Sequence, residues 1–213
     1  MSGATVATVA VRFDQPRAIE PEDQVRADFY ALLASLFYHA PDAALLQAII
    51  ISAEPSSESA SPLTLAWSQL AAASAVVTPD AVAEEYASVF VGVGRPPVML
   101  FGSFYLAGFM NEKPLAELRG ELARLGYARG ADATEPEDHL AALCDVMRAM
   151  ILGDLNSPPA SIESQRTFFA RHMQPWLLQC CDATSENAKS NYYSKVAAFA
   201  RAFFEIEIQA FEM

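Results

Sequence analysis

The amino-acid sequence predicts an all-α protein, a helical bundle of about ten helices, and three observations support this. Apolar residues recur at spacings of three and four along most of the chain, which places them on one face of a helix. Strands are not expected, because no run of alternating apolar and polar residues leads into a hairpin turn. No segment repeats at a fixed period, so a bundle is expected rather than a solenoid.

The first part of the chain is expected to contain an arm and two helices. Residues 1–22 carry two prolines and no sustained helical period, so we expect a mobile N-terminal arm outside the core. A helical pattern then starts at Val25 and stops at Pro41. A second helix is expected from Asp42, and it ends before residues 54–62, whose serines and prolines are typical of a loop.

Four helices are expected in the middle of the chain, with an apolar loop between the second and the third. Residues 63–77 are rich in Ala and Leu, and the next helix runs from 79 to 90 with a proline in its first turn. Residues 91–101 hold two glycines and two prolines, so they must form a loop. Two shorter helices, 103–111 and 115–125, follow this loop.

Three periodic segments, at residues 137–152, 161–173 and 186–209, are expected to be helices in the last part of the chain. The last is the clearest, because its apolar side chains step by four and three residues and must face the core: Tyr192, Val196, Phe199, Phe203 and Ile206. Before it, Pro175 and Trp176 favour a helix break packed by an aromatic side chain.

The helices are expected to form two subdomains. The chain has 213 residues and is 53% hydrophobic, which is ample for one large domain or for two subdomains that share a core. A polar connector follows residue 126. We therefore place an N-terminal helical subdomain at residues 23–126, the connector at 127–139 and a C-terminal helical subdomain at 140–213.

Composition and charge exclude several classes of function. With 14 Lys and Arg residues against 26 Asp and Glu residues, the formal net charge is −12, the wrong sign for a surface that binds nucleic acid. Cys144, Cys180 and Cys181 form no C-x-x-C pair, so neither a disulfide framework nor a zinc site is expected. No basic residue precedes the short apolar run near the N-terminus, and no stretch approaches the length of a membrane span, so we expect a cytoplasmic protein.

The most concentrated polar cluster is Glu-Pro-Glu-Asp-His at residues 135–139, at the entry to a predicted helix. Thr134 and Glu137 match a capping box, which accounts for part of the cluster. Asp138 and His139 lie outside the apolar face of that helix and have no such explanation. They could accept hydrogen bonds from a guanidinium or ammonium group of a partner, and His139 would make that contact depend on pH.

An enzymatic use of the cluster is the alternative. A hydrolase or a nucleotide-binding protein would use Glu137, Asp138 and His139, with the imidazole as a general base. No serine or cysteine in a recognisable nucleophile setting accompanies His139, so no catalytic residue is predicted. The three histidines form no i, i+4 pair of ligands, so no metal site is predicted.

Four motifs in a fixed order resemble those of the TorD/DmsD family of redox-enzyme maturation chaperones. They are Tyr86-x-x-Val89-Phe90 followed by Gly92, Ser103-x-Tyr105, the complete Glu135-Pro136-Glu137-Asp138-His139 segment, and His172-x-x-Pro175-Trp176. The resemblance implies a helical fold of two subdomains joined by a hinge at the third motif. It also implies a chaperone that binds the twin-arginine signal peptide and the precursor of a molybdopterin-containing oxidoreductase, prevents premature export and assists cofactor insertion.

The resemblance also implies roles for single residues. Asp138, His139 and Glu135 would contact the signal peptide, and Pro136 and Glu137 would shape the hinge. The apolar part of the peptide would need a groove, which we expect near the apolar loop, lined by Tyr86, Phe90, Met99, Phe101, Phe104 and Tyr105. No bound cofactor is expected, although the resemblance implies weak binding of guanine nucleotide. The chain is expected to be a monomer or a homodimer that swaps subdomains through the connector.

Overall fold

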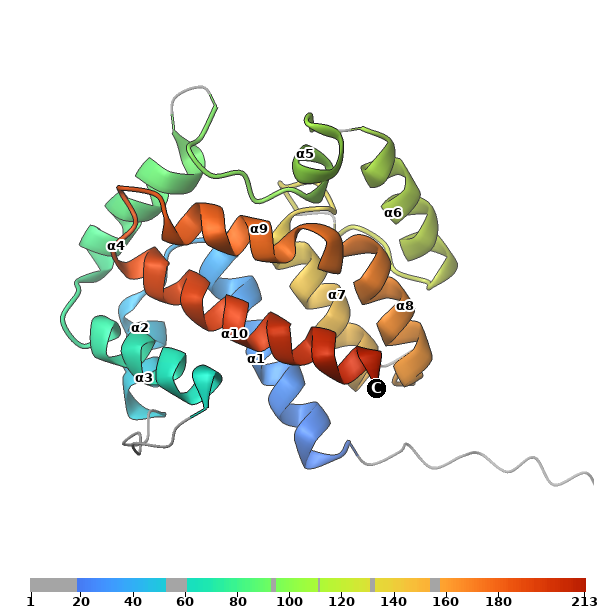
Figure 1. The fold of residues 1–213 in the computed structure, drawn as a ribbon, viewed down its shortest axis with the longest axis horizontal. Helices are drawn as coiled ribbons and strands as arrows, with labels where there is room; N and C mark the ends of the chain where they lie inside the picture. The colour runs from blue at the N-terminus through green and yellow to red at the C-terminus, as the bar shows by residue number, and fades with distance from the viewer. Residues whose placement is uncertain (1–18, 53–60, 93–94, 111, 131–132, 154–157) are drawn as a thin grey trace, which may run out of the picture.

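The computed structural model confirms the all-α prediction (Figure 1). Six segments of the chain are described: residues 19–52, 61–92, 95–110, 112–130, 133–153 and 158–213. These segments contain ten α-helices and one π-helical turn. Their only pairing of extended backbone is a single bridge between Phe101 and His139.

The helices follow one another along the chain. The first half of the chain contains α1 (Pro21–Tyr38), α2 (Ala43–Ile51), α3 (Pro62–Ser74), α4 (Pro79–Tyr86), the π-helical turn η1 (Ala87–Val91) and α5 (Gly102–Ala107). The second half contains α6 (Lys113–Arg124), α7 (Leu140–Leu152), α8 (Ile162–His172), α9 (Gln174–Ser185) and α10 (Tyr192–Glu212). None of these helices combines the length and the apolar character that a membrane span requires.

Local sequence explains where most helices begin. In four of them the N-cap side chain accepts a hydrogen bond from the backbone N–H three residues further on: Asp42 for α2, Ser61 for α3, Thr78 for α4 and Ser161 for α8. Proline stands in the first turn of α1, α3, α4, α6 and α9, where its missing N–H costs no intrahelical bond. The predicted starts of α2, α3, α4 and α8 are therefore close to the observed ones.

The helices pack around α10, which crosses the middle of the molecule in Figure 1. α9 lies beside α10, α3 contacts it further along, and α1 packs along α7. The stripe predicted for the last helix is mostly confirmed, because four of its five side chains are buried and Ile206 is exposed. Buried apolar residues from Ala27 to Phe211 form one cluster to which both predicted subdomains contribute. The division of the chain into two subdomains remains a prediction.

The start of α1 differs from the prediction. It begins at Pro21, inside the range assigned to the N-terminal arm, whereas the pattern of apolar residues placed the start near Val25. A proline fits the first turn of a helix, and the acidic residues Glu22 and Asp23 interact favourably with the positive end of the helix dipole. Residues 1–18, which make up most of the predicted arm, lie outside the described residues.

The chain between α8 and α10 also differs from the prediction. α9 occupies a stretch for which the sequence predicted only a helix break, because Pro175 stands in the first turn and so begins a helix. α10 then starts at Tyr192 rather than at residue 186. At that point the carboxylate of Glu85, from α4, accepts hydrogen bonds from the backbone N–H groups of residues 191–193 at 2.8 to 3.1 Å.

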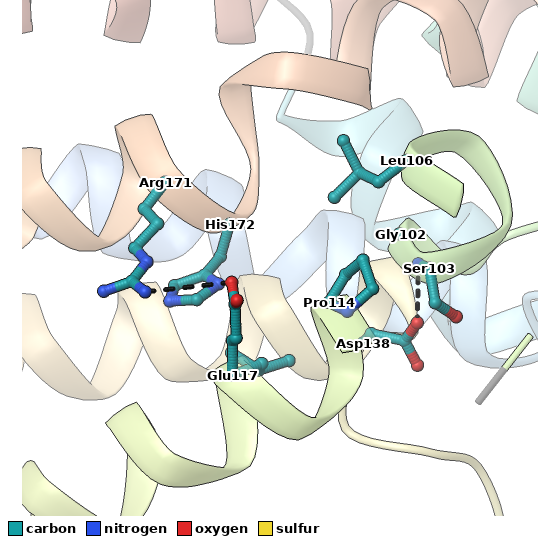
Figure 2. A pocket seen from close by; sticks show the side chains of 9 residues that line it. Gly102, Ser103, Leu106, Pro114, Glu117, Asp138, Arg171 and His172 are labelled. Atoms are coloured by element: carbon teal, nitrogen blue, oxygen red, sulfur yellow. Dashed lines mark hydrogen bonds and ion pairs between the residues drawn. The ribbon is translucent and has the colours of Figure 1, made fainter. Parts of the chain in front are cut away.

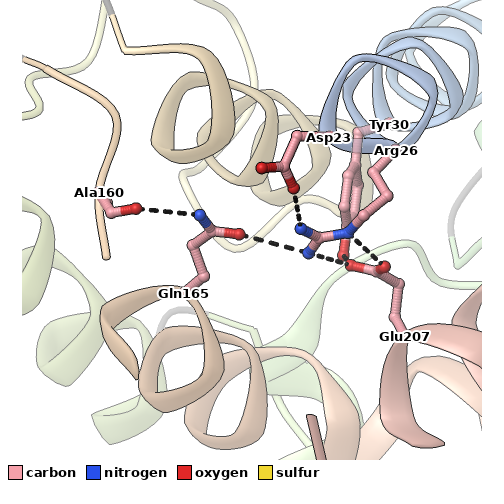
Figure 3. A network of polar contacts seen from close by, with 6 residues as sticks. All are labelled: Asp23, Arg26, Tyr30, Ala160, Gln165 and Glu207. Carbon is pink, nitrogen blue, oxygen red and sulfur yellow. Dashed lines mark hydrogen bonds and ion pairs between the residues drawn. The ribbon is translucent and has the colours of Figure 1, made fainter. Parts of the chain in front are cut away.

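A buried polar network joins α1, α8 and α10 (Figure 3). The Nε of Arg26 donates a hydrogen bond to Glu207 at 2.7 Å, and the hydroxyl of Tyr30 donates to the other oxygen of the same carboxylate at 2.9 Å. Arg26 also pairs with Asp23 and donates to the side chain of Gln165. Glu207 is 1% exposed, so its charge is compensated inside the protein.

Candidate functional site

The Glu-Pro-Glu-Asp-His segment, residues 135–139, is held against the apolar loop that precedes α5. The N–H of Gly102 donates a hydrogen bond to the carbonyl oxygen of Asp138 at 2.9 Å. The N–H of Leu140 donates to the carbonyl oxygen of Leu100 at 2.8 Å. Backbone hydrogen bonds therefore fix the segment on the start of α5.

The carboxylate of Asp138 has two oxygen atoms in different surroundings. Oδ2 accepts a hydrogen bond from the backbone N–H of Ser103 at 2.8 Å, which caps the start of α5. Oδ1 is buried and has no hydrogen-bond partner among the described residues, and the same is true of the Ser103 hydroxyl. The two residues are 4% and 1% exposed. Both border the same pocket, which Figure 2 shows from close by.

The pocket has a volume of about 110 Å³ and lies where α5, α6 and α8 meet residue 138. In Figure 2, Asp138 and Ser103 lie at one end, and Glu117, Arg171 and His172 lie at the other. Apolar side chains form the walls between these ends: Leu106, Pro114 and Leu118. The pocket is thus a short slot with polar groups at both ends.

The charged groups at the second end of the pocket are paired with one another. Arg171 Nη2 lies 3.8 Å from a carboxylate oxygen of Glu117, and its Nη1 lies 3.3 Å from one of Glu121. The Nε2 of His172 lies 2.8 Å from the same oxygen of Glu121. Asp138, in contrast, has no cationic side chain within ion-pair distance in the part of the chain that the structure describes.

His139 has a structural role beside the pocket. It is the N-cap of α7, where its Nδ1 accepts a hydrogen bond from the N–H of Ala141 at 3.1 Å. Its ring packs edge-on against Phe101 and Tyr38, with centroids 5.0 and 6.3 Å apart. Burial lowers the pKa of His139 to about 4, so the imidazole is neutral near pH 7. A contact made by His139 would therefore not change with pH near pH 7, unlike the contact expected from the sequence.

Glu137 pairs within the protein instead of capping a helix. Its carboxylate accepts a hydrogen bond from the Nε of Arg119, in α6, at 2.9 Å. Burial opposes ionisation, but the hydrogen bond and charge of Arg119 lower the pKa of Glu137 below its ordinary value. The capping box predicted for Thr134 and Glu137 does not form, because α7 begins only at Leu140.

Glu135 and Pro136 are half-buried on the other side of the segment. Burial first, and then the charge of the nearby Glu135, raises the pKa of Tyr86 to about 12. The hydroxyl of Tyr86 donates hydrogen bonds to the carbonyl oxygens of Phe37 and Tyr38 at the end of α1. Glu135 thus faces Tyr86, while Asp138 faces the pocket.

The six residues predicted to line an apolar groove differ in accessibility. Phe90 and Met99 are buried, and the other four are half-buried. Tyr105 donates a hydrogen bond to the carbonyl oxygen of Met99 at 2.9 Å and stacks on Trp176. The guanidinium of Arg95 lies 4.6 Å from the ring centre of Phe104. The groove made of these residues remains a prediction.

Two exposed apolar residues near the end of α5 were not singled out in the sequence. Leu106 lies in α5 and borders the pocket, and Phe109 follows α5; they are 43% and 72% exposed. Their three-residue spacing was the available signal, but in a sequence it looks the same as the spacing of a buried face. Leu106 gives the rim of the pocket an apolar side.

Glu137, Asp138 and His139 do not converge on one reaction centre, because they face Arg119, the pocket and the start of α7, respectively. Among the described residues, no group of three or more His, Cys, Asp or Glu side chains could hold a metal ion. Burial raises the pKa of the Cys180 thiol to about 12, which makes it a poor nucleophile. The arrangement gives no support to the hydrolase alternative.

Known proteins resemble this chain in sequence. The sequence model of the nitrate reductase delta subunit family matches residues 56–182. The chaperone protein TorD of Aliivibrio fischeri is 23% identical over 132 residues, which cover 59% of this chain and 61% of that protein. The chaperone protein TorD of Ferrimonas balearica is 26% identical over 144 residues, which cover 65% and 63%. The matches thus span less than two thirds of the length of these curated relatives.

A solved structure shares the fold. It is that of a proposed redox enzyme maturation protein from Archaeoglobus fulgidus, with a TM-score of 0.57 over 91% of this chain and 99% of that chain. The two sequences are 18% identical. This similarity concerns the arrangement of the helices and not the residues of the pocket.

Proposed function

The chain belongs to the nitrate reductase delta subunit family, and we propose that it is a non-enzymatic, cytoplasmic chaperone for a molybdopterin-containing oxidoreductase. It binds the precursor of that enzyme through the twin-arginine signal peptide, prevents premature export and assists cofactor insertion. The resemblance to the TorD/DmsD family is confirmed, since the matching relatives are named TorD chaperones. Their name supports the chaperone role proposed for this chain.

One observation supports peptide binding independently of the family relationship. Asp138, in the motif at residues 135–139, borders a pocket, and the buried Oδ1 of its carboxylate has no hydrogen-bond partner among the described residues. A basic peptide can supply that partner, because a guanidinium or ammonium group donates strong hydrogen bonds to a carboxylate. Backbone hydrogen bonds from the start of α5 hold the carboxylate in place before the peptide arrives.

The residues of the motif have different roles in this proposal. Asp138 contacts the peptide directly. His139 fixes the start of α7, and with it the position of Asp138. Glu135 lies toward Tyr86 and adds a second acidic group for the peptide at the far side of the segment. Pro136 and Glu137 shape the turn, and Glu137 ties it to Arg119 of α6.

The surroundings of the pocket suit the rest of a signal peptide. Beyond its arginines such a peptide is apolar, and the exposed side chain of Leu106 offers it an apolar surface at the pocket. The net charge of −12 favours approach by a basic segment.

The proposal includes no nucleotide in this pocket. Sites for drug-sized ligands enclose about 300–1,000 Å³, whereas this pocket encloses about 110 Å³. This pocket has room for a ligand the size of a side-chain head group.

Complex formation with the precursor tests the proposed function. The chain is mixed with the precursor of a molybdenum oxidoreductase from the same organism, with the same protein lacking its signal peptide, and with the signal peptide fused to an unrelated carrier. We expect light scattering after gel filtration to show a complex with the first and third proteins and a weaker one, or none, with the second. Absence of a complex with both signal-bearing proteins would contradict the proposal.

A further inference from the structure

The surface around α2 and α3 differs in charge from the rest of the molecule. Charged residues make up 19% of the chain and give it a net charge of −12. The described residues between Asp42 and Asp80 include no charged side chain, and they form α2 and α3. Glu54 and Glu58, which stand between these helices in the sequence, lie outside the described residues. Two neighbouring helices of an acidic protein are therefore uncharged (Figure 1).

One face of α3 packs on the core and the opposite face is exposed to solvent. Ala66, Leu70 and Ser74 are buried on the side of the helix that packs on α10. The exposed residues on the other side step by four, three and four, and they continue into the turn after the helix: Leu65, Gln69, Ala72 and Val76. Leu65 is 50% exposed and Val76 is 83% exposed. These four residues form the α3 stripe.

The α3 stripe has the composition of an interface rather than that of a solvated helix face. A helix face that only contacts water normally carries charged side chains. The exposed side of α6, for comparison, carries Lys113, Glu117 and Arg124. Charged residues are depleted at the centre of protein interfaces, where apolar side chains are buried. The exposed leucine and valine of the uncharged stripe are therefore suited to contact with another protein.

The charge of the protein indicates which partner fits the α3 stripe. Two copies of the chain each carry a net charge of −12 and repel each other. A contact through faces that carry carboxylates would place like charges opposite one another. A two-fold axis brings the same patch of both copies together, so that patch must be complementary to itself. An uncharged, partly apolar stripe meets this condition, and it lets two acidic copies meet without like charges in contact.

The order of the residues in the α3 stripe fits antiparallel pairing. With a two-fold axis midway between Gln69 and Ala72, Leu65 of each copy lies opposite Val76 of the other copy. Gln69 then lies opposite Ala72, so a long side chain meets a small one in the middle of the contact. The dipoles of two antiparallel helices also interact favourably, whereas those of two parallel neighbours oppose each other.

We propose that the α3 stripe is the interface of a homodimer in which two copies of this chain meet through antiparallel α3 helices. The stripe spans roughly 16 Å along the helix. Such a contact is at the small end for a specific interface, so dimer formation depends on protein concentration. Figure 1 shows α3 at the other end of the molecule from α5 and α6, which line the pocket near Asp138. Both pockets stay accessible, so under the proposed function one dimer holds two precursors.

Sedimentation velocity of the full chain, from about 1 to about 300 µM, measures the dimer. We expect the fraction of dimer to rise with concentration. We also expect the dissociation constant to fall at least 3-fold when NaCl is raised from about 50 to about 500 mM, because salt screens the repulsion between the two acidic copies. A dimer held by ion pairs would show the opposite dependence on salt.

A carboxylate placed in the stripe should separate the two copies. Ala72→Glu puts one negative charge from each copy near the two-fold axis, and we expect the dissociation constant to rise at least 10-fold. Ala170→Glu, at an exposed position of α8, is the matched control and should change it less than 2-fold. Glutamate is a good helix former, so both variants should melt within a few degrees of the wild type.

Disulfide formation tests the antiparallel register. Gln69→Cys and Ala72→Cys are incubated with oxidised glutathione, each alone and as a mixture of the two variants. The native cysteines are all buried and should not react. We expect the mixture to form disulfide-linked dimers faster than either variant alone, with one chain of each kind in most of them. Faster linkage in either variant alone would overturn the antiparallel arrangement.

Three outcomes would overturn the α3 interface, and none of them is expected if the proposal holds. The chain could stay monomeric over the whole concentration range at both salt concentrations. A dimer could form that Ala72→Glu leaves unchanged, and its slow dissociation would indicate exchanged subdomains. The chain could be monomeric while the precursor slows hydrogen exchange in α3, which would assign the stripe to the client. The first two outcomes are measured without a precursor and leave the proposed chaperone function untouched.

Discussion

At the scale of single residues, Gly102 determines how closely α5 approaches the core. A Cβ atom at this position would lie 2.9 Å from Trp176 Nε1 and 3.1 Å from its Cε2. The indole is buried and donates a hydrogen bond to the carbonyl oxygen of His172 at 2.7 Å. The indole therefore has little freedom to move, and the next residue, Ser103, owes its place in the pocket wall to this close approach.

The Gly102→Ala variant should be destabilised for this reason. Overpacking of a well-packed interior costs roughly 1–3 kcal/mol, and we expect a loss of that size in chemical denaturation. Gly120→Ala is the control, because Gly120 lies in the exposed part of α6 and a Cβ there meets no atom within 4 Å. It should gain up to about 1 kcal/mol from helix propensity. Equal stabilities of the two variants would show that α5 can shift freely.

His139 gives stability a specific dependence on pH. Its pKa is about 4 in the folded protein and about 6.5 in the unfolded chain, so the unfolded state binds more protons between these values. The free energy of unfolding should therefore fall as the pH drops from about 6.5 to about 4, by an amount on the order of 3 kcal/mol. His139→Asn keeps a capping side chain that does not titrate. Denaturation curves measured from pH 7 to pH 4 should show a shallower decline of the free energy of unfolding for this variant. Equal declines in the variant and the wild type would show that His139 is not the group responsible.

At the scale of elements, the start of α10 depends on a residue from another helix. The carboxylate of Glu85 accepts three hydrogen bonds from the backbone N–H groups at residues 191–193. A negative charge at this end of a helix also interacts favourably with the helix dipole. The helix that contributes the most buried residues is therefore fixed at its N-terminus by α4.

Glu85→Gln tests this capping interaction. The variant keeps one acceptor oxygen but loses the charge and the second oxygen, so we expect a loss of roughly 1–2 kcal/mol in the free energy of unfolding. Glu84→Gln removes the same charge from an exposed neighbour and should change stability by less than about 0.5 kcal/mol. Hydrogen exchange should also quicken in the first turn of α10 in Glu85→Gln alone. Unchanged exchange rates in the first turn of α10 would mean that the helix does not need the cap from Glu85.

The elements differ in how far the sequence could predict them, and the reason is physical. α2, α3, α4 and α8 begin at capping side chains or first-turn prolines within the same segment, so local patterns found their starts. α9 was missed because Pro175 was interpreted as a break. The starts of α7 and α10 depend on contacts with distant segments, namely the bridge to Phe101 and the cap from Glu85. Contacts between distant segments cannot be predicted from the local spacing of apolar residues.

At the scale of the whole molecule, the buried pair of Arg26 and Glu207 connects the two ends of the described chain (Figure 3). Removing one member of such a pair leaves an uncompensated buried charge, which costs roughly 3–5 kcal/mol. We therefore expect Arg26→Met to lower the free energy of unfolding by an amount in this range. The double variant Arg26→Met, Glu207→Met should lose less stability. Thermal or chemical unfolding of both variants provides the measurement.

An exposed pair serves as the control for this prediction. Arg201 pairs with Asp182 and Glu205 at the surface, and Arg201→Met should cost less than about 1 kcal/mol. If Arg26→Met cost no more than Arg201→Met, the buried network would not hold α1, α8 and α10 together.

The candidate site was predictable in part. The sequence led to residues 135–139 and to Asp138 within them, because an unusual run of polar groups at a helix entry is visible without a structure. It could not reveal that Asp138 is buried, that Ser103 shares its pocket or that Arg171 pairs with Glu117. Those relations arise only when α5, α6 and α8 pack around the segment. The exposed side chain of Leu106, which borders the pocket, was likewise not singled out in the sequence.

The most direct test of the account is hydrogen–deuterium exchange of the chain, alone and bound to the signal-bearing precursor. The account predicts that binding slows exchange in three segments around the pocket, residues 98–106, 112–118 and 136–141, and leaves α2 and α3 unchanged. The same experiment with Asp138→Asn at equal precursor concentration should show little protection. Protection confined to other surfaces, or full protection of these three segments in Asp138→Asn, would contradict the claim that the precursor binds through the Asp138 pocket.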